Sequence, residues 1–179
     1  MSSMTKFVMF AVFILCETIL AQTKLPYFRK INLPESAKSA LNTYYGRWDY
    51  CKGEVPAFDP KGKHIGWEYA DVIKGDFNGD GNTDYAVLVR LSDSIESRQS
   101  NLAVLFGKGN QFVVLVVRAD YYSSDNILYL QKRGKSIEDV EAGKIIKLKY
   151  DAIDDAIFEK VSTTYYYHDG RFSAIFSGD

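Results

Sequence analysis

Cysteine and histidine are scarce in this chain, and their scarcity excludes several kinds of small domain and site. The 179 residues include two cysteines and two histidines. Cys16 falls in a segment that reads as a cleaved leader, which leaves Cys51 without a partner for an internal disulfide. The stability of the fold must therefore come from its core, or from a bound metal. His64 and His168 each stand beside a glycine-containing turn and not in a ligand-spaced pair, which argues against zinc.

Recognisable catalytic motifs are also missing. The sequence contains no G-x-S-x-G elbow, no Walker loop and no H-E-x-x-H helix. Cys51 could act as a nucleophile or bridge two chains, but no histidine stands near it in sequence, and we interpret it as a small half-buried apolar residue. The adjacent acids Asp154 and Asp155, like Glu138 and Asp139, are interpreted as solvated turns and not as a glycosidase pair.

A strong charge of either sign is absent as well. The chain has 22 basic and 23 acidic residues, a formal net charge of −1, which argues against nucleic acid as a partner. Hydrophobic residues make up 46%, charged residues 25% and aromatic residues 15%, as in an ordered globular protein. We expect a single globular domain over residues 22–179.

The only long apolar run lies at the N-terminus and reads as a signal peptide over residues 1–21. Lys6 supplies the positive start, residues 7–15 form the apolar stretch, and Ala21 offers a cleavage point. A membrane anchor is the first alternative, but Glu17 interrupts the stretch and a span needs about 20 apolar residues. A lipoprotein at Cys16 is the second, and Leu15 before it argues against that reading. The sequence therefore predicts a secreted protein, periplasmic or extracellular, with no membrane span.

The first structured segment is predicted to be a helix that starts at Pro34 and stops at Gly46. Its apolar residues repeat with helical spacing: Ala37, Ala40, Leu41, Tyr44 and Tyr45. Residues 47–66 are rich in glycine and proline, so we expect a long irregular connection there. The aromatic residues Trp48, Tyr50 and Trp67 flank this connection and leave open an aromatic cleft.

From residue 67 onward the pattern becomes that of β-strands. Glycine-containing turns between neighbours favour hairpins, so we expect an α+β fold, mostly an antiparallel sheet of seven to eight strands with the N-terminal helix packed on one face. Residues 85–89 and 113–117 are apolar throughout and are predicted to lie centrally. A short helical turn is predicted to begin at Ser136. The expected strands cover residues 67–73, 85–91, 102–106, 112–117, 127–130, 145–150, 156–167 and 172–176.

The segment 76–84 concentrates oxygen-bearing side chains with a spacing that suits calcium. A hard cation takes six or more oxygens, and a coiled loop can turn alternate side chains and one carbonyl inward. Gly81 allows the sharp turn. Position 12, where a helix-loop-helix site has its bidentate glutamate, is Val87, which argues against an EF-hand. Positions 1, 3, 5, 7 and 9 are Asp76, Asn78, Asp80, Asn82 and Asp84.

This loop, set between two strand-like segments, resembles the calcium loops of FG-GAP/VCBS-type (integrin-like) β repeats, with the pattern D-x-[DN]-x-D-G-x-x-D. The later residues 104–109 and Phe112 are similar to the family's phenylalanine-glycine strand, so the resemblance covers about residues 69–112. It implies calcium ligation by the side chains of Asp76, Asn78, Asp80 and Asp84 and by the carbonyl of Asn82. The motif occurs once, which argues against a complete β-propeller.

The competing interpretation of the loop is a pair of turn dipeptides, Asn78-Gly79 and Asp80-Gly81, with solvated carboxylates. A turn alone does not require three aspartates, whose repulsion is unfavourable without a cation, and we favour calcium. Tyrosine runs at 121–122 and 165–167 are either a binding surface or cross-strand packing, and packing is preferred.

These features together predict a secreted domain with a structural calcium ion, acting as a non-catalytic module that binds a protein or a glycan. Two alternatives stay open. One is a secreted hydrolase with a calcium-supported cleft, and the other is an inhibitor or immunity-type protein.

Overall fold

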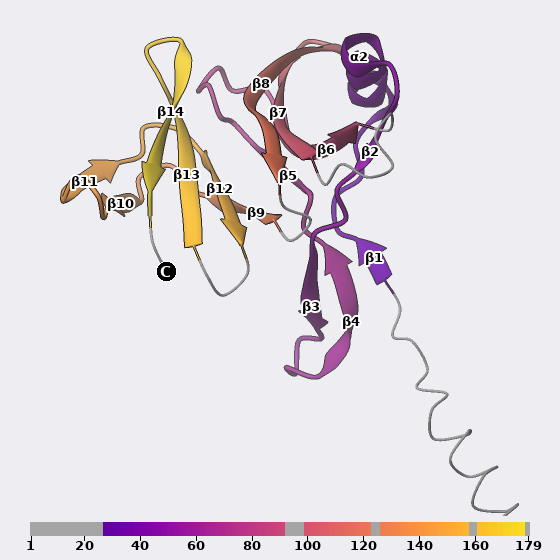
Figure 1. Cartoon of the computed structure of the whole chain (residues 1–179), viewed down its shortest axis with the longest axis horizontal. Helices are drawn as coiled ribbons and strands as arrows, with labels where there is room; N and C mark the ends of the chain where they lie inside the picture. Colours follow the sequence, from indigo (N-terminus) through magenta and orange to yellow (C-terminus); the bar gives the residue numbers. More distant parts are fainter. Residues whose placement is uncertain (1–26, 92–98, 123–125, 158–160, 178–179) are drawn as a thin grey trace, which may run out of the picture.

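The structure, a computed structural model, describes residues 27–91, 99–122, 126–157 and 161–177. Within these ranges the chain forms one helix and fourteen strands, mostly antiparallel, so the predicted fold class is confirmed and the predicted strand count of seven to eight is too low. The described strands form four sheets and close no propeller (Figure 1). The predicted signal peptide lies outside the described residues.

Helix α2 (Glu35–Tyr45) forms where the sequence predicts it. Pro34 precedes it in an extended conformation. Gly46 ends it with φ +72°, and the N–H of Gly46 donates a hydrogen bond to the Asn42 carbonyl. Ala37 and Leu41 are fully buried. The helix therefore presents one apolar stripe to the sheet below it (Figure 1).

The large sheet carries the helix on one face. Its strands are β2 (Trp48–Tyr50) and β5 (Val72–Gly75), which both pair with β6 (Asp84–Leu91), followed by β7 (Gln99–Lys108) and β8 (Gln111–Tyr122). Residues 85–89 lie in β6, which is central as predicted. Residues 113–117 lie in β8, the edge strand, and the prediction of a central position for them is wrong. Residues 113–117 are apolar although only one edge of β8 is paired among the described strands.

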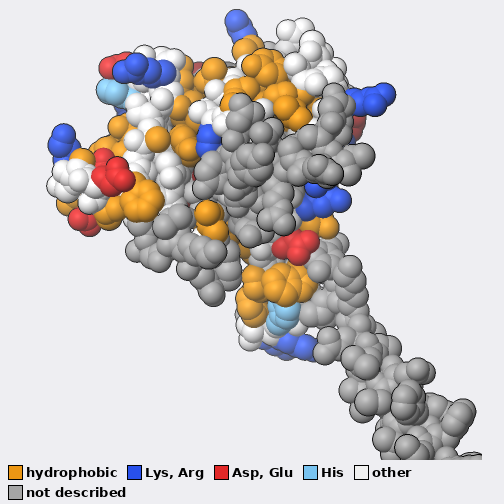
Figure 2. All heavy atoms as spheres, in the orientation of Figure 1, with side chains coloured by type: hydrophobic (Ala, Val, Ile, Leu, Met, Phe, Trp, Pro, Cys, Tyr) orange, Lys and Arg blue, Asp and Glu red, His pale blue; other side chains and the backbone are white. Residues whose placement is uncertain are grey.

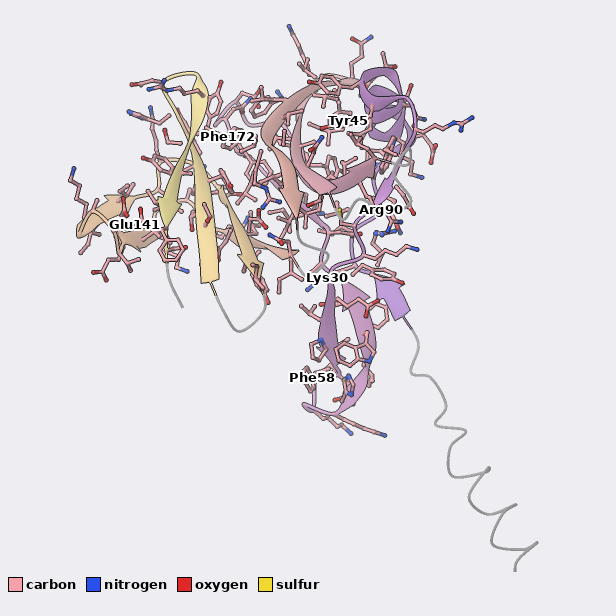
Figure 3. The ribbon with its side chains drawn as sticks, in the orientation of Figure 1. Lys30, Tyr45, Phe58, Arg90, Glu141 and Phe172 are labelled. Carbon is pink, nitrogen blue, oxygen red and sulfur yellow. The ribbon has the colours of Figure 1, made fainter. Side chains whose placement is uncertain are left out.

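A second sheet covers the other face of the large sheet. It has the order β14 (Arg171–Phe176), β13 (Val161–His168), β12 (Ala152–Ile157), β9 (Asn126–Gln131). Its buried Leu128 and Ile153 share a core cluster with Leu88 and Leu102 of the large sheet. Figure 3 shows Phe172 on the side of β14 that faces the large sheet, where its ring stacks on Phe106 with centroids 6.1 Å apart. The layers are thus helix, sheet and sheet.

Two segments fold differently from their predictions. Residues 47–66 are not an irregular connection, because β3 (Glu54–Phe58) and β4 (His64–Tyr69) form a hairpin, joined in parallel by β1 (Tyr27–Arg29). The predicted helical turn at Ser136 is instead strand β10 (Ser136–Asp139), paired with β11 (Lys144–Lys147). Both segments find strand partners that satisfy their backbone groups, and this pairing overrides local turn composition.

The β3–β4 hairpin projects from the body of the molecule (Figures 1 and 2). His64 lies between Phe58 and Trp67, with ring centroids 5.5 Å away on either side. Trp48 and Tyr50 pack on each other elsewhere, on β2. The aromatic residues around 47–66 therefore form two separate contacts and not one cleft. No helix in the described ranges is long and apolar enough to cross a membrane.

Candidate metal centre

The loop 76–84 connects two antiparallel strands of the large sheet. Strand β5 enters it, β6 leaves it, and Gly75 pairs with Asp84 at its base. No helix borders it on either side, and Val87 lies buried inside β6. The arrangement agrees with the expected strand-loop-strand setting and with the exclusion of a helix-loop-helix site.

The first half of the loop is coiled by hydrogen bonds from its own backbone to its own side chains. The Asp76 carboxylate accepts from the N–H of Gly79 at 2.8 Å and of Gly81 at 3.2 Å. The Asn78 side-chain oxygen accepts from the N–H of Asp80 at 3.0 Å, and Asp80 accepts from the N–H of Asn82 at 2.8 Å. Three predicted ligands are thereby brought together around one tight coil.

The two glycines make this coil possible. Gly79 has φ +77° and Gly81 has φ +82°, in the left-handed region that a side chain disfavours. Gly79 also lies beneath the ring of Tyr150, where a Cβ would come within 2.0 Å of the Cε1 atom. Around Gly81 the space is open. Gly79 is thus required by conformation and by packing, and Gly81 by conformation alone.

Asp84 lies at the base of the loop and faces the interior of the protein. It is fully buried, and its two oxygens accept from the N–H of Phe77 and of Gly107, each at 2.9 Å. Burial raises the pKa of Asp84, the two backbone N–H groups oppose this, and the charge of Asp80 adds to it. In contrast, the N–H of Asn82 holds the pKa of the exposed Asp80 below its usual value. Asp84 therefore ties the loop to the end of β7.

Contacts from distant parts of the chain hold the loop from outside. Asp151 donates its N–H to the Asp76 carbonyl at 3.2 Å, and its carboxylate accepts from the N–H of Asp76 at 3.3 Å. Gly107 lies so close to the Thr83 carbonyl that a Cβ would come within 2.4 Å of the oxygen. Gly107 is the glycine of the phenylalanine-glycine pair, so the sequence already contained a motif that marks this contact with the loop. Nothing near residue 76 in the sequence points to Asp151 or Tyr150.

The donor chemistry of the loop fits calcium. All candidate donors are carboxylate, amide or carbonyl oxygens, the ligands of hard cations. A carboxylate has about four lone-pair sites, so one hydrogen bond per oxygen leaves each able to bind a cation. Asp84 points toward Phe77 and Gly107, and within the described residues no three side chains of His, Cys, Asp or Glu converge as a metal cluster.

Cys51 does not offer an alternative catalytic centre. It packs beside the core between the large sheet and the second sheet, and burial raises the pKa of its thiol to about 12. A thiol of this kind carries almost no thiolate near neutral pH, and the thiolate is the nucleophile. The interpretation as a half-buried apolar residue agrees with this environment.

Asp154 and Asp155 are not a solvated turn, and that interpretation is wrong. Both are buried in the central strand β12. Asp155 lies 2.8 Å from the Arg118 guanidinium and accepts from the Asn126 amide at 2.6 Å, while Asp154 accepts from the Thr164 hydroxyl at 3.1 Å. Each carboxylate has its own partners, and neighbouring residues of a strand point to opposite faces. Both carboxylates therefore have structural partners, one on each face of β12.

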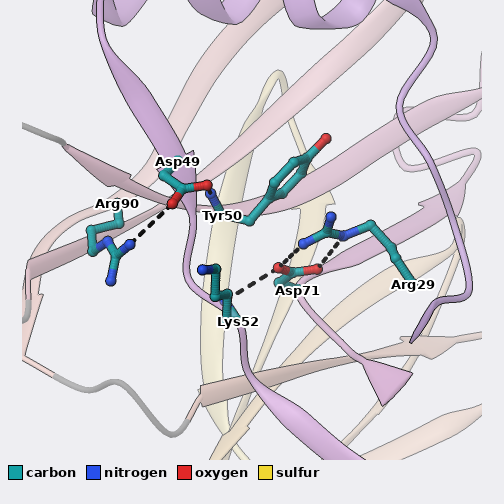
Figure 4. Close-up of polar contacts among 6 residues, drawn as sticks. All are labelled: Arg29, Asp49, Tyr50, Lys52, Asp71 and Arg90. Atoms are coloured by element: carbon teal, nitrogen blue, oxygen red, sulfur yellow. Dashed lines mark hydrogen bonds and ion pairs between the residues drawn. The ribbon is translucent and has the colours of Figure 1, made fainter. Parts of the chain in front are cut away.

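A second buried ion pair fixes β1 to the large sheet. The Arg29 guanidinium donates to both oxygens of the fully buried Asp71, at 3.1 and 2.8 Å, and lies 3.6 Å from the ring centroid of Tyr50 (Figure 4). The N–H of Lys52 donates to the same carboxylate. The Asp71 carboxylate thus holds together β1, the segment after β2 and the segment before β5, and its role is structural.

The tyrosines of residues 165–167 are half-buried and take part in packing. Tyr165 and Tyr166 border core clusters, and Tyr167 packs edge-on against Phe106 and Phe172. The packing interpretation is confirmed for this run, while the side chains of residues 121–122 lie outside the described part of the chain.

Comparison with known proteins leaves the site to be judged on its own geometry. No family model matches the chain, and neither a curated protein nor a solved structure matches it.

Proposed function

We propose that the protein is a secreted, non-catalytic binding module whose loop 76–84 holds one structural calcium ion. The observation that carries the proposal is the charge of the loop. Three carboxylates, Asp76, Asp80 and Asp84, share nine residues, and among the described residues no lysine or arginine forms an ion pair with any of them. A divalent cation would supply the missing positive charge.

The coil of the loop supports the same proposal. Asp76, Asn78 and Asp80 are already folded onto one turn, so binding would require little further ordering of the chain. In the bound state, Asp76, Asn78, Asp80 and Asp84 would bind through side-chain oxygens and Asn82 through its carbonyl. Calcium is preferred to magnesium, which retains its waters and rarely uses such cages. Three carboxylates suit an affinity on the order of micromolar to millimolar, as in extracellular modules.

A structural role follows from the position of the loop. It is joined to the end of β7 through Gly107 and to the residue before β12 through Asp151. Phe77 within the loop is fully buried in the core between the sheets. An ion here would fix contacts among three segments. Secretion is supported by the leader-like residues 1–21, and a binding role by the lack of any arrangement around Cys51 or Asp154 that would serve catalysis.

Thermal unfolding with and without calcium tests the metal. Binding to the folded form alone stabilises it by about 2.7 kcal/mol when free calcium is about a hundred times Kd, which for a domain of this size raises Tm by about 5–10 °C. Asp80 is exposed, so Asp80→Ala should remove the rise without disturbing the core.

The matched control is Asp59→Ala. Asp59 also accepts two backbone N–H bonds in a turn, from Lys61 and Lys63, but it lies in the β3–β4 hairpin and outside the loop. Asp59→Ala should retain the full calcium response. Identical melting of the wild-type protein in EDTA and in millimolar calcium would contradict the proposal.

A further inference from the structure

The first half of strand β8 has an apolar edge that no described strand pairs with, while Arg118 and Asp120 lie further along the same strand. Among the described strands it pairs only with β7, so along its outer edge every second residue turns its N–H and C=O away from a partner. Edge strands in natural proteins are usually protected from pairing with another chain by lysine, by proline or by being short. Residues 111–117 contain neither charge nor proline, and Val113 and Leu115 are 55% and 38% exposed.

Beside this edge lies a groove of about 690 Å³ whose other wall is helix α2. The helix contributes small side chains, Ser36, Ser39, Ala40 and Thr43, and Tyr44 lines the groove as well with 56% of its surface exposed. The strand side runs through residues 110–114. None of the lining residues is charged.

The two faces of β8 would offer different surroundings to an added strand. Phe112 and Val114 turn toward the core beneath α2, whereas Val113 and Leu115, on the opposite face, stay exposed. A strand laid along the edge would place alternate side chains under the helix, against Ser39 and Thr43 among others, and the remaining ones beside Val113 and Leu115. The groove therefore accepts small neutral side chains on one face and apolar ones on the other.

We infer that this groove, bounded by α2 and the β8 edge, binds an extended, uncharged peptide segment of another protein as an additional antiparallel strand. The unpaired backbone groups favour a peptide, since another strand satisfies their regular spacing. The uncharged walls favour a neutral segment, because a buried charge without a partner is costly.

A second copy of this chain fits the groove less well. Two β8 edges paired antiparallel are related by a two-fold axis perpendicular to the sheet. That symmetry would bring both α2 helices to the same face of the joined sheet, where each helix would flank the added strand of the other copy. The inference deepens the proposed binding function and rests on it, but it does not depend on the calcium ion, because the groove is lined by α2 and residues 110–114 alone.

Fluorescence anisotropy with a labelled peptide of alternating threonine and valine, about eight residues long to span the edge, tests the inference on the full mature chain. We expect saturable binding, in EDTA as well as in calcium, so a failure of the metal proposal would not be mistaken for a failure of this one. Val113→Lys should weaken peptide binding and raise the Kd by about tenfold or more. Ile145→Lys, at a residue 75% exposed on β11, is the matched control and should leave binding unchanged.

Thr43→Arg provides a second variant, on the helix wall, whose loss of binding would not depend on the folding of β8. Circular dichroism melts establish that each variant is folded. Three results would overturn the inference: no saturable binding, equal affinity for a peptide of alternating threonine and lysine, or no effect of either groove variant. Sedimentation that reveals a dimer dissociated by Val113→Lys would also overturn it, in favour of a second copy.

Discussion

The two glycines of the loop allow a comparison between backbone strain and packing. At Gly81 an alanine would adopt φ near +82° with no atom in its way. The left-handed conformation costs about 1–2 kcal/mol, and the stiffer unfolded chain offsets about 0.4–1 kcal/mol of this. We therefore expect Gly81→Ala to lower the free energy of unfolding by about 1 kcal/mol.

At Gly79 the same substitution adds a clash. The φ value of +77° is nearly the same, but the new Cβ would lie 2.0 Å from Cε1 and 2.2 Å from Cδ1 of Tyr150. The ring must move by roughly 1.5 Å to regain a contact distance of about 3.5 Å, and overpacking of this kind costs about 1–3 kcal/mol. Gly79→Ala should therefore destabilise the fold by about 2–4 kcal/mol.

Urea denaturation followed by circular dichroism measures both variants. With m values of about 1–3 kcal/mol/M, the expected difference between them moves the midpoint by about 1 M. Measurements in EDTA keep any effect on metal binding out of the comparison. Tyr150→Ala removes the ring with which the new Cβ clashes. Gly79→Ala should therefore destabilise the Tyr150→Ala variant less than it destabilises the wild-type protein. Equal destabilisation by the two glycine variants would refute the reasoning.

Two further predictions concern residues outside the loop. Because burial raises the pKa of the Cys51 thiol to about 12, iodoacetamide at pH 8 should label the native protein far more slowly than the urea-unfolded chain, and similar rates would contradict the assigned environment. Asp71→Ala leaves Arg29 without its buried partner and should cost about 3 kcal/mol in urea denaturation, whereas Asp49→Ala, which breaks the exposed pair with Arg90 (Figure 4), should cost less than about 1 kcal/mol. Equal losses for these two variants would contradict the assigned burial.

Local signals in the sequence were sufficient for the helix and for the first half of the loop. Pro34 and Gly46 mark the helix ends, and an apolar stripe between them decides its buried face. In the loop, Asp76, Asn78 and Asp80 bond to backbone groups within five residues, so their arrangement follows from spacing alone.

Other features depend on partners that are distant in sequence, and these were missed. An apolar run indicated a central strand at 113–117, yet α2 buries one face of β8 while Val113 remains exposed on the other. Asp155 was taken for a solvated residue, because its partner Arg118 lies far from it along the chain. Asp84 was predicted to contribute a side-chain oxygen to a cation site, and its hydrogen bond from Gly107, 23 residues further along the chain, could not be read from the local spacing.

The contact of the loop with Asp151 has a consequence for the order in which the chain assembles. Asp76 and Asp151 are separated by 75 residues, and the two strands β9 and β12 of the second sheet must be formed and docked before they meet. A nascent chain that ends before β9 already contains every predicted ligand, yet it lacks Tyr150 and Asp151 against which the coil rests. Contacts of such long range form late in folding, because the 75 residues between Asp76 and Asp151 must first lose conformational entropy. If the loop binds calcium as proposed, binding at full affinity would therefore require that the two sheets have already joined.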